Sequence, residues 1–329
     1  MRRLVLVVIG LTASAVALYL AVRSVDLAVT LDTIAAASLT PLLAALLLLF
    51  ISMVLRSWRW QRLLAVSPPV RRILPVLLVG YLGNAVLPVR LGEPIRSYVL
   101  ARREGLSSAG VFGTSILERI VDLATLALMA FLATLAIGAP DWLTQLTGAA
   151  AGVALAVLVV LVFVGIGPLL RLLHRFVGAE PGGIVGRLLG PLERFAVGIG
   201  GQARGASVGQ AVAISVPIWL ADSTVCWLVA RSLGIDLGPA ESLIVIAVGA
   251  LGTSIPSAPG YVGTFELAVS SAAGALGVPA AQALALAVLF HAITLVPLAI
   301  AGAISLLMLG SGGLGTLARA TELERGPPG

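Results

Sequence analysis

The chain contains no lysine, a single cysteine and two histidines, and only 11% of its 329 residues are charged. Cys226 has no second cysteine to pair with, which excludes a disulfide within the chain and a cysteine-based metal site. His174 and His291 are too far apart in sequence for their spacing to indicate a metal site. The zinc-protease, phosphate-loop and serine-nucleophile motifs are also absent. We therefore expect no metal, no cofactor and no catalytic residues.

Long apolar stretches are what the chain has in abundance. Hydrophobic residues make up 59% of it, and its mean hydropathy is +1.08. The first stretch resembles a signal peptide, but it is too long and lacks a convincing cleavage site, so we interpret it as a retained span. A helix needs about 20 apolar residues to cross a bilayer. The sequence thus predicts an all-α polytopic membrane protein with about six spanning helices, at residues 4–22, 39–55, 114–138, 149–169, 208–230 and 283–309.

The basic residues, all of them arginine, follow the topology of a membrane protein. If the N-terminus is cytoplasmic, most of the 21 arginines fall in cytoplasmic segments, including the run that holds Arg56, Arg59 and Arg62. The outer loops then keep only Arg23 and Arg231. This distribution satisfies the positive-inside rule. It predicts a multi-pass protein of the cell (inner) membrane with both termini in the cytoplasm, and it explains the high isoelectric point without nucleic acid binding.

Two further apolar regions, residues 73–101 and 241–274, do not fit as single spans. The arginine distribution requires the first region to enter and leave the membrane on the cytoplasmic side. Counting the spans from there, the second region must enter and leave on the outer side. Each leg of roughly 10 to 15 residues is too short to cross the hydrocarbon core. Two re-entrant helical hairpins follow, facing each other. The alternative is that both regions are ordinary kinked helices in a packed bundle.

The string V-G-x-L-G occurs in both regions, at residues 79–83 and 248–252, and each copy runs into a proline-glycine break and then a glutamate. A broken segment repeated in corresponding positions is typical of a transporter binding site. We expect one transmembrane domain, residues 1–329, with inverted repeats at about 39–138 and 208–309. Short basic and apolar pieces predict a cytoplasmic amphipathic loop at about 171–206.

The first break predicts an anion site. Gly92, Glu93 and the following proline resemble a helix start, whose free amides and positive dipole end attract anions. Arg90 and Arg96 flank that start, and arginine grips phosphate with two donors at once. The alternative is that these arginines only pair with nearby carboxylates and hold the hairpin in place. Small or polar residues beside the break, among them Asn84, could equally serve close helix packing.

The next span carries the sequence L-E-R-I-V-D, which places Glu118, Arg119 and Asp122 on one helical face. Ionisable groups in a membrane normally face a bundle interior or a cavity. The equivalent place in the second half is F-H-A-I-T, with His291. Histidine can relay protons near neutral pH, although a single buried histidine is often only a hydrogen-bonded core residue. Asp222 and Glu266 are the other buried carboxylates that could exchange protons.

Four segments together resemble the flippase-like transmembrane domain family named after lysylphosphatidylglycerol synthase. They are R-S-W-R-W-Q-R-L-L, G-N-A-V-L-P-V-R-L-G-E-P-I-R, L-E-R-I-V-D and P-S-A-P-G-Y-V-G-T-F-E. The resemblance covers nearly the whole chain and implies lipid translocation between leaflets. No aminoacyl-transferring synthase domain is present, so the chain resembles a stand-alone member. The second proline-glycine motif has Tyr261 where the family pattern has a Gly-Gly pair, which adds bulk near the expected cavity.

We therefore predict a transporter that moves an anionic lipid, of the phospholipid or polyprenyl-phosphate type, between leaflets. The headgroup phosphate would bind at the helix start of Gly92 between Arg90 and Arg96, and Arg119 would complete the basic lining. Glu93, Glu118 and Asp122 would orient the arginines. Envelope lipid-synthesis enzymes would be the partners. Two rivals stay open: a membrane-embedded lipid transferase or phosphatase that uses the same charges, and a non-transporting scaffold. The second hairpin would form a gate or proton relay through Pro256, Pro259, Gly260, Glu266, His291 and Asp222.

Overall fold

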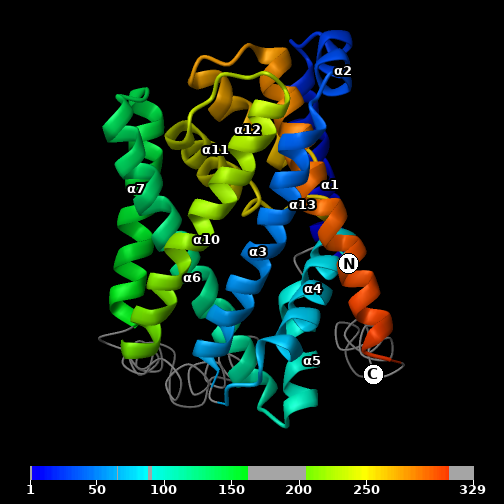
Figure 1. The fold of residues 1–329 in the computed structure, drawn as a ribbon, viewed down its shortest axis with the longest axis vertical. Helices are drawn as coiled ribbons and strands as arrows, with labels where there is room; N and C mark the ends of the chain where they lie inside the picture. The colour runs from blue at the N-terminus through cyan, green and yellow to red at the C-terminus, as the bar shows by residue number, and fades with distance from the viewer. Residues whose placement is uncertain (1, 65, 88–90, 162–204, 311–329) are drawn as a thin grey trace.

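The computed structural model describes residues 2–64, 66–87, 91–161 and 205–310. All regular structure in these ranges is helical, which confirms an all-α polytopic membrane protein (Figure 1). Five helices are long and apolar enough to span a bilayer, or six if the bent pair formed by α1 and α2 counts as one span. The long helices are α1 (Arg2–Val22), α3 (Leu39–Leu63), α6 (Ser108–Ile137), α7 (Asp141–Val159), α10 (Gly205–Ser232) and α13 (Ala280–Met308).

Local signals in the sequence set several helix ends. The Asp26 side chain accepts hydrogen bonds from two amides at the start of α2 (Leu27–Ala35), a helix that lies where a loop was expected and bends 87° from α1. Ser107 caps α6, and Gly138 ends that helix in the left-handed conformation, with φ of 64°. Helix α7 starts earlier than predicted. Residues 162–169 of that predicted span and residues 171–204 of the predicted amphipathic loop lie outside the described residues.

Both regions predicted to be re-entrant are helical hairpins. The first consists of α4 (Val70–Val86) and α5 (Gly92–Glu104), and the second of α11 (Pro239–Gly252) and α12 (Thr264–Ala275), with the short 3-10 helix η3 (Pro259–Tyr261) between its legs. In Figure 1 the first hairpin lies in the lower half of the bundle and the second in the upper half. Their breaks meet, because η3 packs on α4. Each leg is shorter than the roughly 20 residues of a spanning helix.

The packing partners of the two halves correspond. Helix α4 packs on α13, and its counterpart in the second half, α11, packs on α6. Helix α5 packs on α6, and its counterpart α12 packs on α13. Helices α3 and α10 pack on each other and run in opposite directions, since the Ser38 amide at the start of α3 donates to the Ser232 carbonyl at the end of α10, at 2.8 Å. An inverted repeat produces this exchange of partners.

The glycines of V-G-x-L-G let the two legs of each hairpin approach closely. A Cβ atom on Gly83 would lie 2.8 Å from the Cα atom of Gly92, and one on Gly252 would lie 2.5 Å from the Cβ atom of Ala268. Both distances are too short for a real side chain. The repeated motif therefore marks the same packing contact in each hairpin, as small residues do elsewhere in membrane proteins.

The outer surface of the bundle is apolar. On α3, Leu39, Leu43 and Leu47 are exposed at intervals of one helical turn, and α13 presents a similar face that includes Ile300 and Ile304. In water such faces would be a liability, but lipid tails solvate them. The polar side chains instead gather at the centre, where the two hairpins meet the long helices.

Candidate functional site

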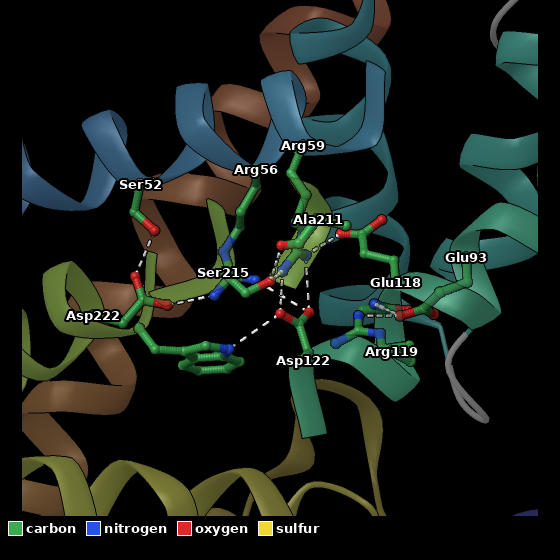
Figure 2. A network of polar contacts seen from close by, with 12 residues as sticks. Ser52, Arg56, Arg59, Glu93, Glu118, Arg119, Asp122, Ala211, Ser215 and Asp222 are labelled. Carbon is green, nitrogen blue, oxygen red and sulfur yellow. Dashed lines mark hydrogen bonds and ion pairs between the residues drawn. The ribbon is translucent and has the colours of Figure 1, made fainter. Parts of the chain in front are cut away.

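Arg59 is the centre of a buried ion-pair network between α3, α6 and α10. Its side chain is fully buried and pairs with both acidic residues of L-E-R-I-V-D. Nη2 donates to Glu118 Oε1 at 2.8 Å and to Asp122 Oδ2 at 3.0 Å. Nη1 donates to Asp122 Oδ1 and, at 2.6 Å, to the Ser215 hydroxyl (Figure 2). One guanidinium therefore joins three long helices.

Arg56, one turn earlier on α3, extends this network to α10. It pairs with Asp222, which also accepts a hydrogen bond from the Ser52 hydroxyl at 2.6 Å. Its second amino group lies 3.6 Å from Asp122. The guanidinium stacks over the ring of Trp219 at 4.9 Å, and the Trp219 indole donates to Asp122 at 3.1 Å. Stacking and pairing together fix its position (Figure 2).

Arg96 of α5 is held as tightly as Arg59. It donates to Glu118 at 3.0 Å, and its guanidinium lies over the ring of Trp60 at 4.5 Å. Only 5% of its side chain is exposed. This is the arrangement expected of a brace between α5, α6 and α3, which was one of the two interpretations of this residue.

Arg119 differs from the other three arginines of the network. It pairs with Glu93 near the start of α5, yet 44% of its side chain is exposed, against at most 7% for Arg56, Arg59 and Arg96. Glu93 also accepts a hydrogen bond from the Asn84 amide at 3.2 Å, and its other oxygen has no partner among the described residues. Of these four cations, Arg119 is therefore the one with room for another partner.

The predicted helix start at Gly92 is present, but its first amide is already engaged. Gly92 begins α5 and is buried, and its N–H donates to Asn84 Oδ1 at 2.9 Å. A Cβ atom at this position would lie 1.9 Å from the Gly80 carbonyl oxygen. Gly92 and Asn84 thus bind the two legs of the hairpin to each other. Arg90 lies outside the described residues.

The second hairpin carries a different pair. Glu266 lies in the first turn of α12, where Oε2 accepts a hydrogen bond from the Gly263 amide at 2.6 Å. Its Oε1 lies 2.5 Å from Nδ1 of His291 on α13. The His291 ring packs against Phe265, with centroids 4.5 Å apart. Both side chains of the pair are more than nine-tenths buried.

A cavity of about 230 Å³ lies between these two groups of charges. It receives the side chains of Arg56, Arg119, Asp222 and His291, and aromatic and aliphatic residues form most of its wall. Both halves of the chain contribute to it. The aromatic residues in its wall are Tyr81, Trp219, Tyr261, Phe265 and Phe290.

A smaller cavity of about 110 Å³ lies between the two breaks. Asn84 and Leu87 line it from the first hairpin, and residues 254–258 line it from the second, Pro256 among them. Tyr261 lines both cavities. The gate residues predicted in the second break are therefore divided: Pro256 faces the small cavity, while Pro259 and Gly260 form the turn that carries Tyr261.

Comparison with known proteins decides the family. Residues 7–302 match the family described as the lysylphosphatidylglycerol synthase TM region. The chain belongs to this family. It is also similar to a protein of the archaeon Haloferax volcanii named Glycosyltransferase AglD, with 27% identity over 326 residues. That alignment covers 88% of this chain and 52% of the relative, so the chain spans about half the length of the curated relative it matches.

The network and the cavity lie within the part of the chain that matches the family. Of the predicted site residues, the structure pairs Glu118 and Asp122 with Arg59, and Glu93 with Arg119. The predicted span 39–55 ended too early, because α3 continues to Leu63 and buries Arg56 and Arg59, which were expected in the cytoplasmic segment after it. The signal that could have found them is their spacing of three, which places them on one helical face, while Arg62 is exposed.

Proposed function

We propose that this chain is a transporter that moves an anionic lipid between the two leaflets of the cell membrane. The headgroup would enter the central cavity while the acyl or polyprenyl chains stay in the bilayer. The observation that carries this proposal is Arg119, a partly exposed arginine in a cavity bounded by both hairpins. The chain's membership of the lysylphosphatidylglycerol synthase TM family supports the same substrate class.

The pairing of charges favours a phosphate as the ligand. In the described residues, Arg56, Arg59 and Arg96 are held by buried carboxylates, so these three serve as a fixed scaffold. Arg119 has one carboxylate partner and exposed donor groups. Guanidinium binds phosphate oxygens with two parallel hydrogen bonds. A lipid phosphate can therefore bind Arg119 beside Glu93, or replace Glu93 as the partner of Arg119, without disturbing the rest of the network.

The arrangement of the hairpins supports alternating access. The two breaks meet near the cavity, and the hairpins enter from opposite ends of the bundle (Figure 1). A modest tilt of either hairpin would open the cavity toward its own side. Transporters built from inverted repeats use this principle around a fixed central site. We propose that envelope lipid-synthesis enzymes supply or consume the lipid.

Reconstitution into vesicles tests the proposal directly. Vesicles with the purified protein and a fluorescent phosphatidylglycerol should equilibrate the label between leaflets faster than protein-free vesicles. Arg119→Gln should slow this by about ten- to a hundredfold, since a hydrogen bond to a charged group contributes about 1.5–3 kcal/mol. Arg103→Gln, at an exposed position near the end of α5, is the matched control. Equal rates with and without protein, or with and without Arg119, would contradict the proposal.

A second candidate is a membrane-embedded transferase, which the name of the archaeal relative, a glycosyltransferase, favours. The cavity holds Asp222, Glu266 is paired with the cavity residue His291, and buried carboxylates can serve in acid-base chemistry. Mass spectrometry of lipids recovered after incubation with the purified protein and a sugar donor separates the two candidates. A glycosylated lipid would favour transfer, and unchanged lipid in the opposite leaflet would favour transport.

A further inference from the structure

Tyr261 lies between the cavity of about 230 Å³, called the central cavity here, and the small cavity between the breaks. It is a lining residue of both. We propose that this ring is a partition that limits the size of the lipid headgroup. The proposal rests on the transport function proposed above. It adds that the part of the headgroup beyond the phosphate lies in the small cavity, and that Tyr261 restricts its size.

The backbone around Tyr261 is fixed by contacts with three helices. The Ala258 amide donates to the Ser14 hydroxyl of α1 at 2.7 Å. A Cβ atom on Gly263 would lie 2.3 Å from the Ser14 carbonyl oxygen, and one on Gly260 would lie 3.2 Å from Leu295 of α13 and 3.5 Å from the Ala85 carbonyl oxygen of α4. These contacts fix the position of the turn in this conformation, and with it the place of the Tyr261 ring between the two cavities.

The conformation of Tyr261 is unfavourable for a residue with a side chain. Its φ is 63°, and it is the one non-glycine residue with positive φ in the described part of the chain. Glycine adopts this left-handed region freely, whereas a Cβ atom crowds the backbone there. Residues held in such conformations cluster at ligand sites and switches. A glycine would fit the backbone better, so the ring itself is what a tyrosine adds at this position.

The two cavities offer different chemistry on either side of the ring. The central cavity has the partly exposed cationic side chain of Arg119, which suits a phosphate. The small cavity has Asn84, Ser254 and Ser257, and the buried Ser257 hydroxyl has no hydrogen-bond partner among the described residues. An unpaired buried hydroxyl is costly, so a polar partner there is favoured. The preferred cargo is a phosphodiester lipid whose hydroxylated headgroup points past Tyr261 toward these groups.

The partition can be tested without a transport assay. In a Cys226→Ala background, Ser257→Cys places a single thiol in the small cavity, and its reaction with a membrane-impermeant thiosulfonate reports access. Labelling should be slow with Tyr261 or Tyr261→Phe, which both keep the ring, and several-fold faster with Tyr261→Gly. The melting temperatures of all three proteins are measured alongside, so that faster labelling of an unfolded protein is recognised. Equal labelling of all three proteins would overturn the partition.

Headgroup selectivity tests the second part of the proposal. In vesicles, the wild-type protein should move phosphatidylglycerol at least about tenfold faster than the bulkier phosphatidylinositol, a ratio within reach of a pocket that excludes by size. Tyr261→Gly should bring the two rates together by raising the second. A ratio unchanged by Tyr261→Gly overturns the size limit. If neither lipid moves with any protein, the transport function fails, while the labelling experiment still decides the partition.

Discussion

The two hairpins share one design and differ in their charge. In each, a glutamate in the first turn of the second leg pairs with a basic residue on the following long helix. The separation is 26 residues between Glu93 and Arg119 and 25 residues between Glu266 and His291. The first pair belongs to a network of four arginines, whereas the second joins one glutamate to one histidine. The comparison teaches that equivalent positions carry an extended charge network in one half and a single buried contact in the other.

Replacing Arg59, the central cation of the ion-pair network, should lower the stability of the protein more than any other change proposed here. Arg59→Met leaves Glu118 and Asp122 buried with one partner fewer, and breaking a buried ion pair costs about 3–5 kcal/mol. We expect a large loss of thermal stability in detergent, measured by the unfolding of the purified protein. Arg62→Met, at an exposed position on the same helix, should change stability by less than about 0.5 kcal/mol. Similar melting temperatures for both variants would show that the network does not hold the first half together.

Two glycine substitutions, one at a contact between hairpin legs and one away from any contact, should have a smaller effect on stability. Gly92→Ala places a methyl group 1.9 Å from the Gly80 carbonyl oxygen, so the legs must separate. Overpacking of this kind costs about 1–3 kcal/mol. In the second hairpin, Gly274→Ala meets nothing within 4 Å and should be neutral or stabilising, because alanine favours a helix. Thermal unfolding of both variants checks the contrast. A neutral Gly92→Ala would mean that the first hairpin is loosely packed.

The smallest expected effect comes from the pair in the second half. His291→Gln replaces the ring whose Nδ1 lies 2.5 Å from Glu266 Oε1, so the contact between α12 and α13 weakens. Because one hydrogen bond contributes about 0.5–1.5 kcal/mol, the melting temperature of the purified protein should fall slightly. A melting temperature equal to that of the wild-type protein would show that this pair does not hold α12 against α13.

Much of the fold could be predicted because it depends on local properties. Apolar runs set the long helices, the parity of arginines indicated the hairpins, and the spacing in L-E-R-I-V-D placed Glu118 and Asp122 on one face. The role of Arg59 could not be predicted in this way. An exposed arginine and a buried arginine look alike in sequence, and only acidic partners on another helix offset the free-energy cost of burying the charge. The pair of Glu266 and His291 likewise depends on the packing of α12 on α13.

The contact between α1 and the second break has a consequence for the order of assembly. Ser14 and its partner Ala258 are separated by 244 residues. Because α1 precedes the second hairpin in the chain, the Ser14 hydroxyl can accept this hydrogen bond only after the intervening helices have been synthesised. The contact therefore forms late in assembly and ties the second break to a helix that was made long before it.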